Sequence, residues 1–461
     1  MITDIITPKK KLFLPGAHTE LRAQNSRTRR VTSVQGNLVA NTRTDISGVS
    51  ARVYKNGTCG FSSMAELSGD AAEAVLRAAS ENAAFMDRHV AKGKAPLPAI
   101  PYESVVSCEE IENAGQKLYI DFIRELDAYI EKNCKNLVSR TVVAYEDSME
   151  KQLVTSDGVD AHTLIPRSYV YLILSAETPD GQPVELFEAP GGEGTFGVNF
   201  RDPAELYPAI DDLYEKVMRK REGVYAQAGE KTVILGGMMT GMLAHEAVGH
   251  TVEADIVLGG SVAGKLLGKR VASDLVTMTD FAHTAFGKRA PLPVFADDEG
   301  TKAQDVTLIK DGILTGYMNS RETAQHFGME PAGNARGFLF SDEPLIRMRN
   351  TAVHPGTDKL EDMIASIDDG YYLISSTNGE ADTTGEFMFG VSMGYEIKNG
   401  KLGKALLDTT VSGVAFEMLK TVDMVSDEMV WTSSGFCGKK QLMPVGMGGP
   451  ALRCRITIGG R

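Results

Sequence analysis

The stretch MLAHEAVGHTVEAD, Met242–Asp255, is the part of the sequence on which both the fold and the function depend. It follows the run TVILGGMMTGM (232–242), which predicts a strand that leads directly into a helix. The helix would carry His245, Glu246 and His250. That triplet is nearly the His-Glu-x-x-His pattern of zinc peptidases, with one residue too many.

The extra residue changes the geometry that the helix must adopt. Histidines at i and i+4 share one helical face, whereas histidines at i and i+5 point about 140° apart on a regular α-helix. Two rings so placed cannot reach one metal. The helix must therefore widen locally, as in a π-bulge, or end so that His250 comes from the following turn. Gly249 permits either distortion at little cost.

A catalytic zinc site needs a third protein ligand and an open position. From the residues alone this third ligand stays open, and a histidine pair on an alanine-rich helix is often only packed or solvated. Cys437, in SSGFCGKKQLMPVGMGG (433–449), is the best-placed cysteine, because glycines flank it and Lys439 and Lys440 nearby would favour a thiolate. Its plain alternative is a small buried hydrophobe. The other eligible residues are Glu253, Asp255, His283, His326 and His354.

The sequence on either side of the motif predicts an α+β protein. Residues 1–227 favour an α/β domain of hairpins and helices, with a tight turn at Asn56-Gly57 and helices over 70–89, 109–134 and 202–223. Residues 228–461 favour a β-rich, partly closed, barrel-like domain that carries the motif helix, with hairpins turned at Asp311-Gly312 and Asn399-Gly400. The segment PKKKLFLPG (8–16) does not read as a helix.

Composition narrows the class of protein. The chain has 461 residues, 43% of them hydrophobic, and a net charge of -13 with dispersed Lys and Arg, which argues against nucleic-acid binding. Its five cysteines form no CxxC pair and no disulfide framework. We found neither a signal-peptide pattern nor a run of membrane-spanning length, so a cytoplasmic protein without a membrane partner is expected.

Several ordered blocks resemble the TldD/PmbA family of metallopeptidases, formerly described as modulators of DNA gyrase, and specifically its TldD-like branch with a metal motif. The blocks cover most of the chain and are most specific from Gly241 onward. In the amino-terminal half they are ELRAQNSRTRRVTSVQGN (20–37) and GVSARVYKNGTCGFSS (48–63). The remaining blocks are HEAVGHTVEADIVLGGSVAGKLLGKRVAS (245–273), DDEGTKAQDVTLIKDGILTGYMNSRETA (297–324), RMRNTAVHPG (347–356), GEADTTGEFMFG (379–390) and CGKKQLMPVGMGGPALRCRITIGG (437–460).

The resemblance implies one Zn²⁺ per chain, bound by His245, His250 and Cys437, with Glu246 as the general base that activates a zinc-bound water. It also implies a homodimer, or a heterodimer with a metal-free paralogue, that encloses a cleft for short or unfolded peptides. Glu253 and Asp255 would orient the histidines by hydrogen bonds to the ring nitrogens that do not bind the metal, or else form an acidic solvated turn. The alternative function is a non-catalytic peptide-binding or regulatory subunit whose metal site is structural or vacant.

Two further residues stand out in GNARG (333–337). Arg336 and Asn334 have side chains that bind a peptide backbone or a carboxylate. Only proximity to the metal site would support such a role.

Overall fold

The structure is a computed structural model that describes residues 2–90, 97–98, 100, 104–108 and 114–459. The chain begins with a short α-helix, α1 (Ile2–Ile6), followed by a 3-10 helix, η1 (Thr7–Leu12). The expectation that PKKKLFLPG forms no helix was therefore wrong for its first residues. Pro8 stands in the first turn of η1, where a proline costs no hydrogen bond. None of the helices in the described residues combines the length and apolar character of a membrane span.

A long sheet forms the amino-terminal half, in the order β3-β2-β1-β5-β6-β4, with β7 and β8 also paired to β6. Asn56 and Gly57 form the predicted tight turn between β2 and β3 with φ of 49° and 86°, which asparagine and glycine tolerate best. The strands are β1 (His18–Val34), β2 (Asn37–Lys55), β3 (Thr58–Met64), β4 (Ser104–Cys108), β5 (Ser139–Thr155), β6 (Asp160–Glu177), β7 (Pro183–Glu188) and β8 (Gly191–Glu193).

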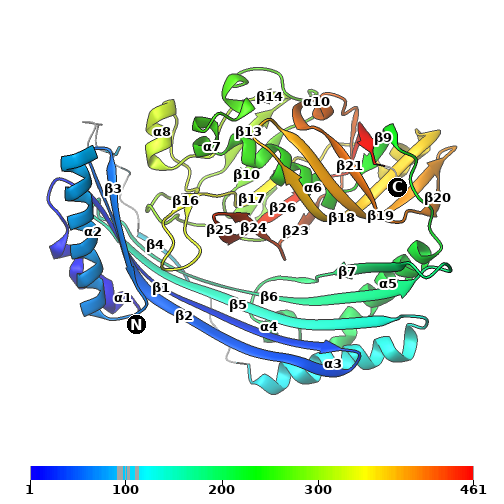
Figure 1. The fold of residues 1–461 in the computed structure, drawn as a ribbon, viewed down its shortest axis with the longest axis horizontal. Coiled ribbons are helices and arrows are strands. Elements are labelled where there is room, and N and C mark those ends of the chain that lie inside the picture. The colour runs from blue at the N-terminus through cyan, green and yellow to red at the C-terminus, as the bar shows by residue number, and fades with distance from the viewer. Residues whose placement is uncertain (1, 91–96, 99, 101–103, 109–113, 460–461) are drawn as a thin grey trace.

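Helices cover one face of this sheet and leave the other to the carboxyl-terminal half. The alanine face of α2 (Gly69–Val90) packs on β1 and β2, and α3 (Gln116–Asn133) and α5 (Tyr207–Arg221) pack on β5 and β6. Figure 1 shows the sheet curving beneath the carboxyl-terminal half, with α3 on the far side. Between α3 and α5 lie the short helices α4 (Phe196–Asn199) and η2 (Pro203–Leu206).

The carboxyl-terminal half contains a closed ring of strands in the order β18-β9-β27-β21-β19, closed by pairing of β19 with β18. β20 extends β19 through the predicted Asn399-Gly400 turn, and β22 pairs with β27. These strands are β9 (Gly229–Leu235), β18 (Asp369–Ala381), β19 (Glu386–Lys398), β20 (Lys401–Ala405), β21 (Thr409–Val414), β22 (Met424–Val425) and β27 (Leu452–Ile458).

A second sheet has the strand order β14-β13-β10-β17-β26-β23, and the motif helix contacts strands of both this sheet and the ring. The hairpin of the second sheet turns at Asp311-Gly312 as predicted. The strands are β10 (Met278–Phe281), β13 (Val306–Lys310), β14 (Ile313–Leu314), β17 (Asn350–Val353), β23 (Val430–Thr432) and β26 (Gly446–Gly449). The smaller elements are α7 (Ala254–Leu258), η5 (Val262–Lys265), β11 (Thr284–Ala285), β12 (Lys288–Arg289), α8 (Arg321–Phe327), β15 (Ala335–Arg336), β16 (Leu345–Ile346), α9 (Leu360–Ala365), α10 (Ala415–Leu419), β24 (Phe436–Lys439) and β25 (Gln441–Pro444).

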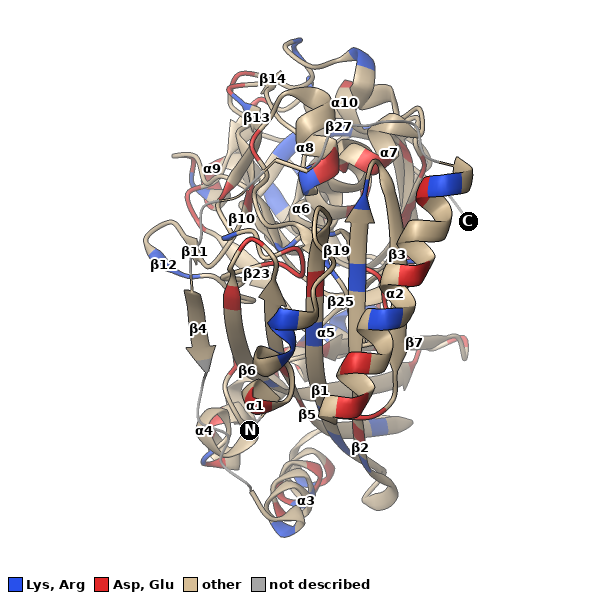
Figure 2. Ribbon diagram, turned by 90° about the vertical axis from the view of Figure 1, so that its left-hand side faces the viewer, with Lys and Arg blue, Asp and Glu red and all other residues tan. Residues whose placement is uncertain are grey.

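The predicted fold class, an α/β half followed by a β-rich, barrel-like half that carries the motif helix, is confirmed. The predicted division at residues 227 and 228 falls in the segment between α5 and β9, and it stays a prediction. Figure 2 shows acidic and basic residues interspersed along α2 and the strands beside it, in keeping with the dispersed Lys and Arg of the sequence.

Candidate metal centre

The motif helix changes its winding at the histidines. It begins as α6 (Gly237–Met242), widens into a π-helix, η3 (Leu243–Gly249), and ends in a 3-10 turn, η4 (His250–Val252). The backbone N–H of His250 donates to the carbonyl of His245, five residues back. Both predicted distortions are confirmed together: the helix widens, and His250 stands at the start of the next turn.

Glycines let this helix approach its neighbours closely. A Cβ added to Gly249 would lie 2.1 Å from Sδ of Met348, and one added to Gly241 would lie 2.9 Å from the backbone nitrogen of Gly448 in β26. The π-helix is therefore enclosed by backbone and a methionine side chain at distances that only glycine allows.

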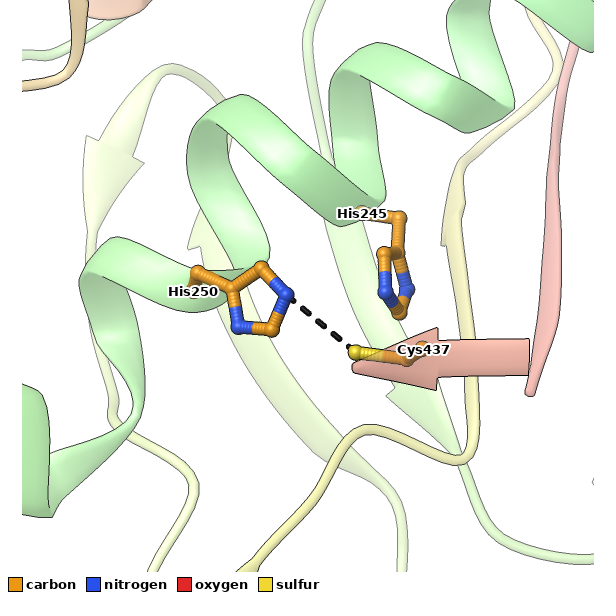
Figure 3. A group of neighbouring side chains, drawn as sticks. All are labelled: His245, His250 and Cys437. Atoms are coloured by element: carbon orange, nitrogen blue, oxygen red, sulfur yellow. Dashed lines mark hydrogen bonds between the residues drawn. The ribbon is translucent and has the colours of Figure 1, made fainter. Parts of the chain in front are cut away.

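Three side chains from two distant segments meet below the helix. One ligand atom each of His245, His250 and Cys437 can be chosen so that all lie within 4.8 Å of one another. Sγ of Cys437 is 3.3 Å from Nε2 of His250, and the two imidazole rings stand at 80° with centroids 5.2 Å apart. Figure 3 shows both rings pointing toward the sulfur. Cys437 lies on β24 of a hairpin with β25, not in a loop.

Glu246 lies beside both imidazoles. Its Oε2 is 3.6 Å from Nε2 of His250 and its Oε1 is 3.9 Å from Nε2 of His245. Its side chain is 25% exposed. Burial raises the pKa of Glu246, with a further rise from Glu253, although His250 lowers it. This placement suits a proton acceptor next to a metal.

The acidic residues after the motif have unequal roles. Glu253 is fully buried, and its Oε2 accepts from Nδ1 of His250 at 2.8 Å. Lys439 lies 3.2 Å from the same oxygen and 2.7 Å from Oδ2 of Asp255. Asp255 thus reaches the histidine only through Lys439 and Glu253. The expectation that Lys439 and Lys440 favour a thiolate is not what the geometry shows, because Lys439 pairs with carboxylates and Lys440 is exposed at the hairpin turn.

Electrostatics differ sharply between the two histidines. Burial lowers the pKa of His245 well below its usual value, and His250 and Arg347 lower it further. Burial also acts to lower the pKa of His250, but hydrogen bonds with Cys437 and Glu253 outweigh it and raise that pKa to about 10. His245 is thus neutral, the form that ligates metal, while His250 would exchange a proton for the cation.

Sequence reasoning missed Arg347, which shapes the hairpin that carries Cys437. Its guanidinium is fully buried and donates to the carbonyls of Cys437 at 2.8 Å and Gln441 at 2.7 Å. The only available signal was its place in RMRNTAVHPG, one of the quoted blocks. A fork of N–H groups that binds two carbonyls across a turn holds both strands in register.

The remaining eligible ligands lie elsewhere in the fold. His283 stacks on Phe295, and His326 is in α8, where its ring meets Phe327 edge-on. His354 hydrogen-bonds Oγ1 of Thr279 at 2.8 Å. Of the two residues of GNARG, Asn334 is buried and donates to Asp280 and to the carbonyl of Arg347, while Arg336 lies between the two halves of the molecule.

The three side chains fit a metal ion. Nδ1 and Nε2 of His245 are both buried and find no hydrogen-bond partner in the part of the chain that the structure describes, which is costly unless another atom binds there. Two imidazoles and one thiolate are a donor set that zinc accepts. Glu253 lies at Nδ1 of His250, away from the Cys437 side of the ring, so it does not take a fourth position among the three ligand atoms.

Residues 19–83, 109–235 and 228–460 match domain 1, the central domain and the C-terminal domain of the PmbA/TldA metallopeptidases, respectively. A metalloprotease of Methanothermobacter thermautotrophicus is 31% identical over 449 residues, which cover 96% of this chain and 95% of the relative. A zinc metalloprotease TldD homolog of Saccharolobus solfataricus is 34% identical over 261 residues, 56% of this chain and 58% of the relative. The crystal structure of TldE from Thermococcus kodakarensis shares the fold, with a TM-score of 0.76 at 17% identity and full coverage of both chains.

Proposed function

The chain belongs to the PmbA/TldD family of metallopeptidases, and on this premise we propose that it is a zinc-dependent peptidase whose metal is held by His245, His250 and Cys437. One observation carries the proposal. Residues far apart in the sequence place a buried, unpartnered imidazole, a second imidazole and a thiol around one point, with the Glu246 carboxylate beside both rings.

The residues of the chain divide the work of peptide hydrolysis. Zinc, when bound, supplies Lewis acidity toward a carbonyl oxygen and makes a water molecule more acidic. Glu246 accepts a proton from the water while the water oxygen forms a bond to the scissile carbonyl carbon. The same carboxyl then donates that proton to the leaving amine nitrogen as the C–N bond breaks. Glu253 holds the His250 ring through Nδ1, so that Nε2 faces Cys437.

The placement of Glu253 bears on the alternative of a non-catalytic subunit. A structural site would need a fourth protein ligand in place of the open position. Among the described residues, the group that could ligate one ion contains only the two histidines and the cysteine. This supports a site with room for water, and hence the peptidase.

We extend the proposal to the substrate and the assembly. The protein would act on short or unfolded peptides inside a cleft enclosed by a homodimer, or by a heterodimer with a metal-free paralogue. Phe436 and Leu442 are 39% and 54% exposed and share the hairpin face opposite Cys437, where they offer an apolar surface on the far side of the hairpin from the metal site. Light scattering after gel filtration, with the protein alone and with the protein mixed with the paralogue, would measure the mass of the complex and so establish the assembly.

Metal content tests the site, and hydrolysis tests the reaction. Mass spectrometry of protein purified without chelator or His-tag should find about one zinc per chain, lost in Cys437→Ala and His250→Ala. Glu246→Gln should keep its zinc and hydrolyse unfolded casein about 100-fold more slowly or worse, because it lacks the proton acceptor. Glu417→Gln, at an exposed position, is the matched control. Zinc retained in Cys437→Ala would overturn the third ligand, and full activity in Glu246→Gln would overturn the mechanism.

A further inference from the structure

A cavity of about 150 Å³ lies between the two halves of the molecule. Its floor is one face of the amino-terminal sheet, because alternate residues of β5 and β6 project to the same side. Asp147 pairs with Arg167, Met149 with Ile165, and Lys151 with Thr163 across these strands. The roof comes from the carboxyl-terminal half and includes Phe295, Asp298, Arg336, Phe338 and Pro444.

The carboxylates that line this cavity are already engaged by donors. Both oxygens of Asp297 accept backbone N–H groups, at 2.8 to 3.0 Å. Oδ2 of Asp298 accepts from Lys151 at 2.7 Å and from the backbone of Gly337 at 2.7 Å, and its Oδ1 lies 3.3 Å from Arg22. Asp147 is held by Arg167 and by the hydroxyl of Tyr145. These carboxylates leave little capacity for a cationic ligand.

The cationic side chains of the cavity are less fully engaged by partners than its carboxylates are. Arg336 donates only to the carbonyls of Met348 and Pro444, and within residues 2–90, 97–98, 100, 104–108 and 114–459 it forms no ion pair with a carboxylate. Burial and the neighbouring Arg347 and Arg349 lower the pKa of Arg336 to about 10, although Asp280 and Asp298, neither of which is paired with it, act to raise that pKa. Lys151 uses two of its three donors, on Asp298 and the carbonyl of Gly337. A half-buried guanidinium without a counter-ion gains most from an anion.

The cavity also adjoins the metal centre. Arg336 binds the carbonyl of Pro444, the last residue of the hairpin strand that pairs with the Cys437 strand. Phe338 lines the cavity and packs against the cluster formed by Cys437, Met443 and Val445. A cavity of about 150 Å³ accommodates a group the size of one side chain.

We propose that this cavity is a subsite for a carboxylate of the peptide substrate, either an acidic side chain or the carboxyl terminus, held by Arg336 with Lys151. Its connection to hydrolysis rests on the proposed function. The binding itself does not, because none of the cavity residues is a proposed metal ligand. Apolar side chains such as Met149 and Phe338 would contact the carbon atoms beside the carboxylate.

Binding of four hexapeptides labelled with an uncharged boron-dipyrromethene dye tests the proposal. All four share one Ala/Leu/Ser sequence. The first pair differs only at the carboxyl terminus, which is a free carboxylate in one peptide and an amide in the other. The second pair is amidated and differs at one internal position, which is Glu in one peptide and Gln in the other. Fluorescence anisotropy is measured with Glu246→Gln protein, with and without zinc. At least one carboxylate-bearing peptide should bind about 10-fold or more tightly than its neutral partner. The free terminus and the internal Glu distinguish the two sources of the carboxylate.

Variants locate the effect. Arg336→Lys keeps the charge but loses the fork, and should remove most of the preference. Met149→Glu, which places a carboxylate on the cavity floor, should abolish the preference without loss of thermal stability. Arg43→Met, at an exposed position of β2, should change nothing. Equal affinity for all four peptides, or an undiminished preference in Met149→Glu, would overturn the proposal. A carboxylate preference in a protein without zinc or hydrolysis would uphold it while the proposed function failed.

Discussion

Glu253 and His250 form a carboxylate–imidazole pair at 2.8 Å, and the carboxylate is completely buried behind the ring. With a proton on Nδ1 donated to Glu253, the lone pair of Nε2 faces Cys437. The pair therefore selects the tautomer that a metal site requires, and it does so from a residue three positions along the chain.

The first prediction concerns this pair. Glu253→Gln should weaken zinc binding about 10-fold to 100-fold, because an amide holds the ring less firmly and can present its own N–H. Competition with a chromogenic zinc chelator measures the affinity. Asp255→Asn is the control, since Asp255 contacts Lys439 and not the ring, and its effect should be several-fold smaller. Equal losses in the two variants would contradict the assignment of Glu253.

The second prediction concerns Arg347. Arg347→Met leaves the buried carbonyls of Cys437 and Gln441 without donors, which should destabilise the fold by about 2 kcal/mol or more and weaken zinc binding. Urea unfolding measures the free energy of unfolding, and the chelator competition measures the zinc affinity. Arg347→Lys keeps a charge but cannot span both carbonyls, so its stability and its zinc affinity should lie between those of wild type and Arg347→Met. Unchanged zinc affinity in Arg347→Met would show that the hairpin holds Cys437 without it.

The third prediction concerns the close approach of the π-helix. In Gly249→Ala the new methyl group would lie 2.1 Å from Sδ of Met348 and 3.0 Å from the carbonyl of Ala244. The variant should lose about 1–3 kcal/mol of stability, together with part of its zinc affinity. Adding Met348→Ala should recover some of the zinc affinity, because it removes the nearer clash. A Gly249→Ala protein with wild-type stability would mean that the helix adjusts freely.

The fourth prediction is a pH dependence of stability. Burial lowers the pKa of Lys151 to about 8, although Asp298 raises it and Arg22 and Arg336 lower it further. The unfolded lysine titrates near its usual value of about 10.4. Between these two values the unfolded state binds more protons, so this residue's contribution to stability rises with pH and is flat below about 8. The unfolding free energy of wild type relative to Lys151→Met should therefore increase by about 1–2 kcal/mol from pH 7 to pH 9.5. No change in that difference would contradict the shifted pKa.

Local patterns in the sequence were sufficient for much of the fold. The Asn-Gly and Asp-Gly turns, the alanine face of α2 and the strand before the motif depend on neighbouring residues, and each forms where it was expected. Spacing also predicted that the helix would either widen or end at the histidines if both bind one metal, because two histidines five residues apart cannot share a face of a regular α-helix. The 3-10 helix at Pro8 was missed, since Lys9–Lys11 give it no apolar face; η1 buries none of its own residues, and Ile6 before it and Phe13 after it reach the core.

By itself, then, the sequence determined that His245, Glu246 and His250 lie close together at a helix that must widen or end there if both histidines bind one metal, since that depends on residues within two turns of each other. Only the tertiary structure decided which distant groups join them. Cys437 faces the histidines because the buried Arg347 fixes its hairpin. Glu253 rather than Asp255 holds the His250 ring, because Asp255 pairs with Lys439 instead. The place of Arg336 in a cavity between the two halves of the chain was likewise decided only by the tertiary structure. The contacts of Arg347 with Cys437, of Cys437 with His250 and of Lys439 with Asp255 join residues 90, 187 and 184 positions apart, and spacing along a chain carries no information on which of them packing will bring together.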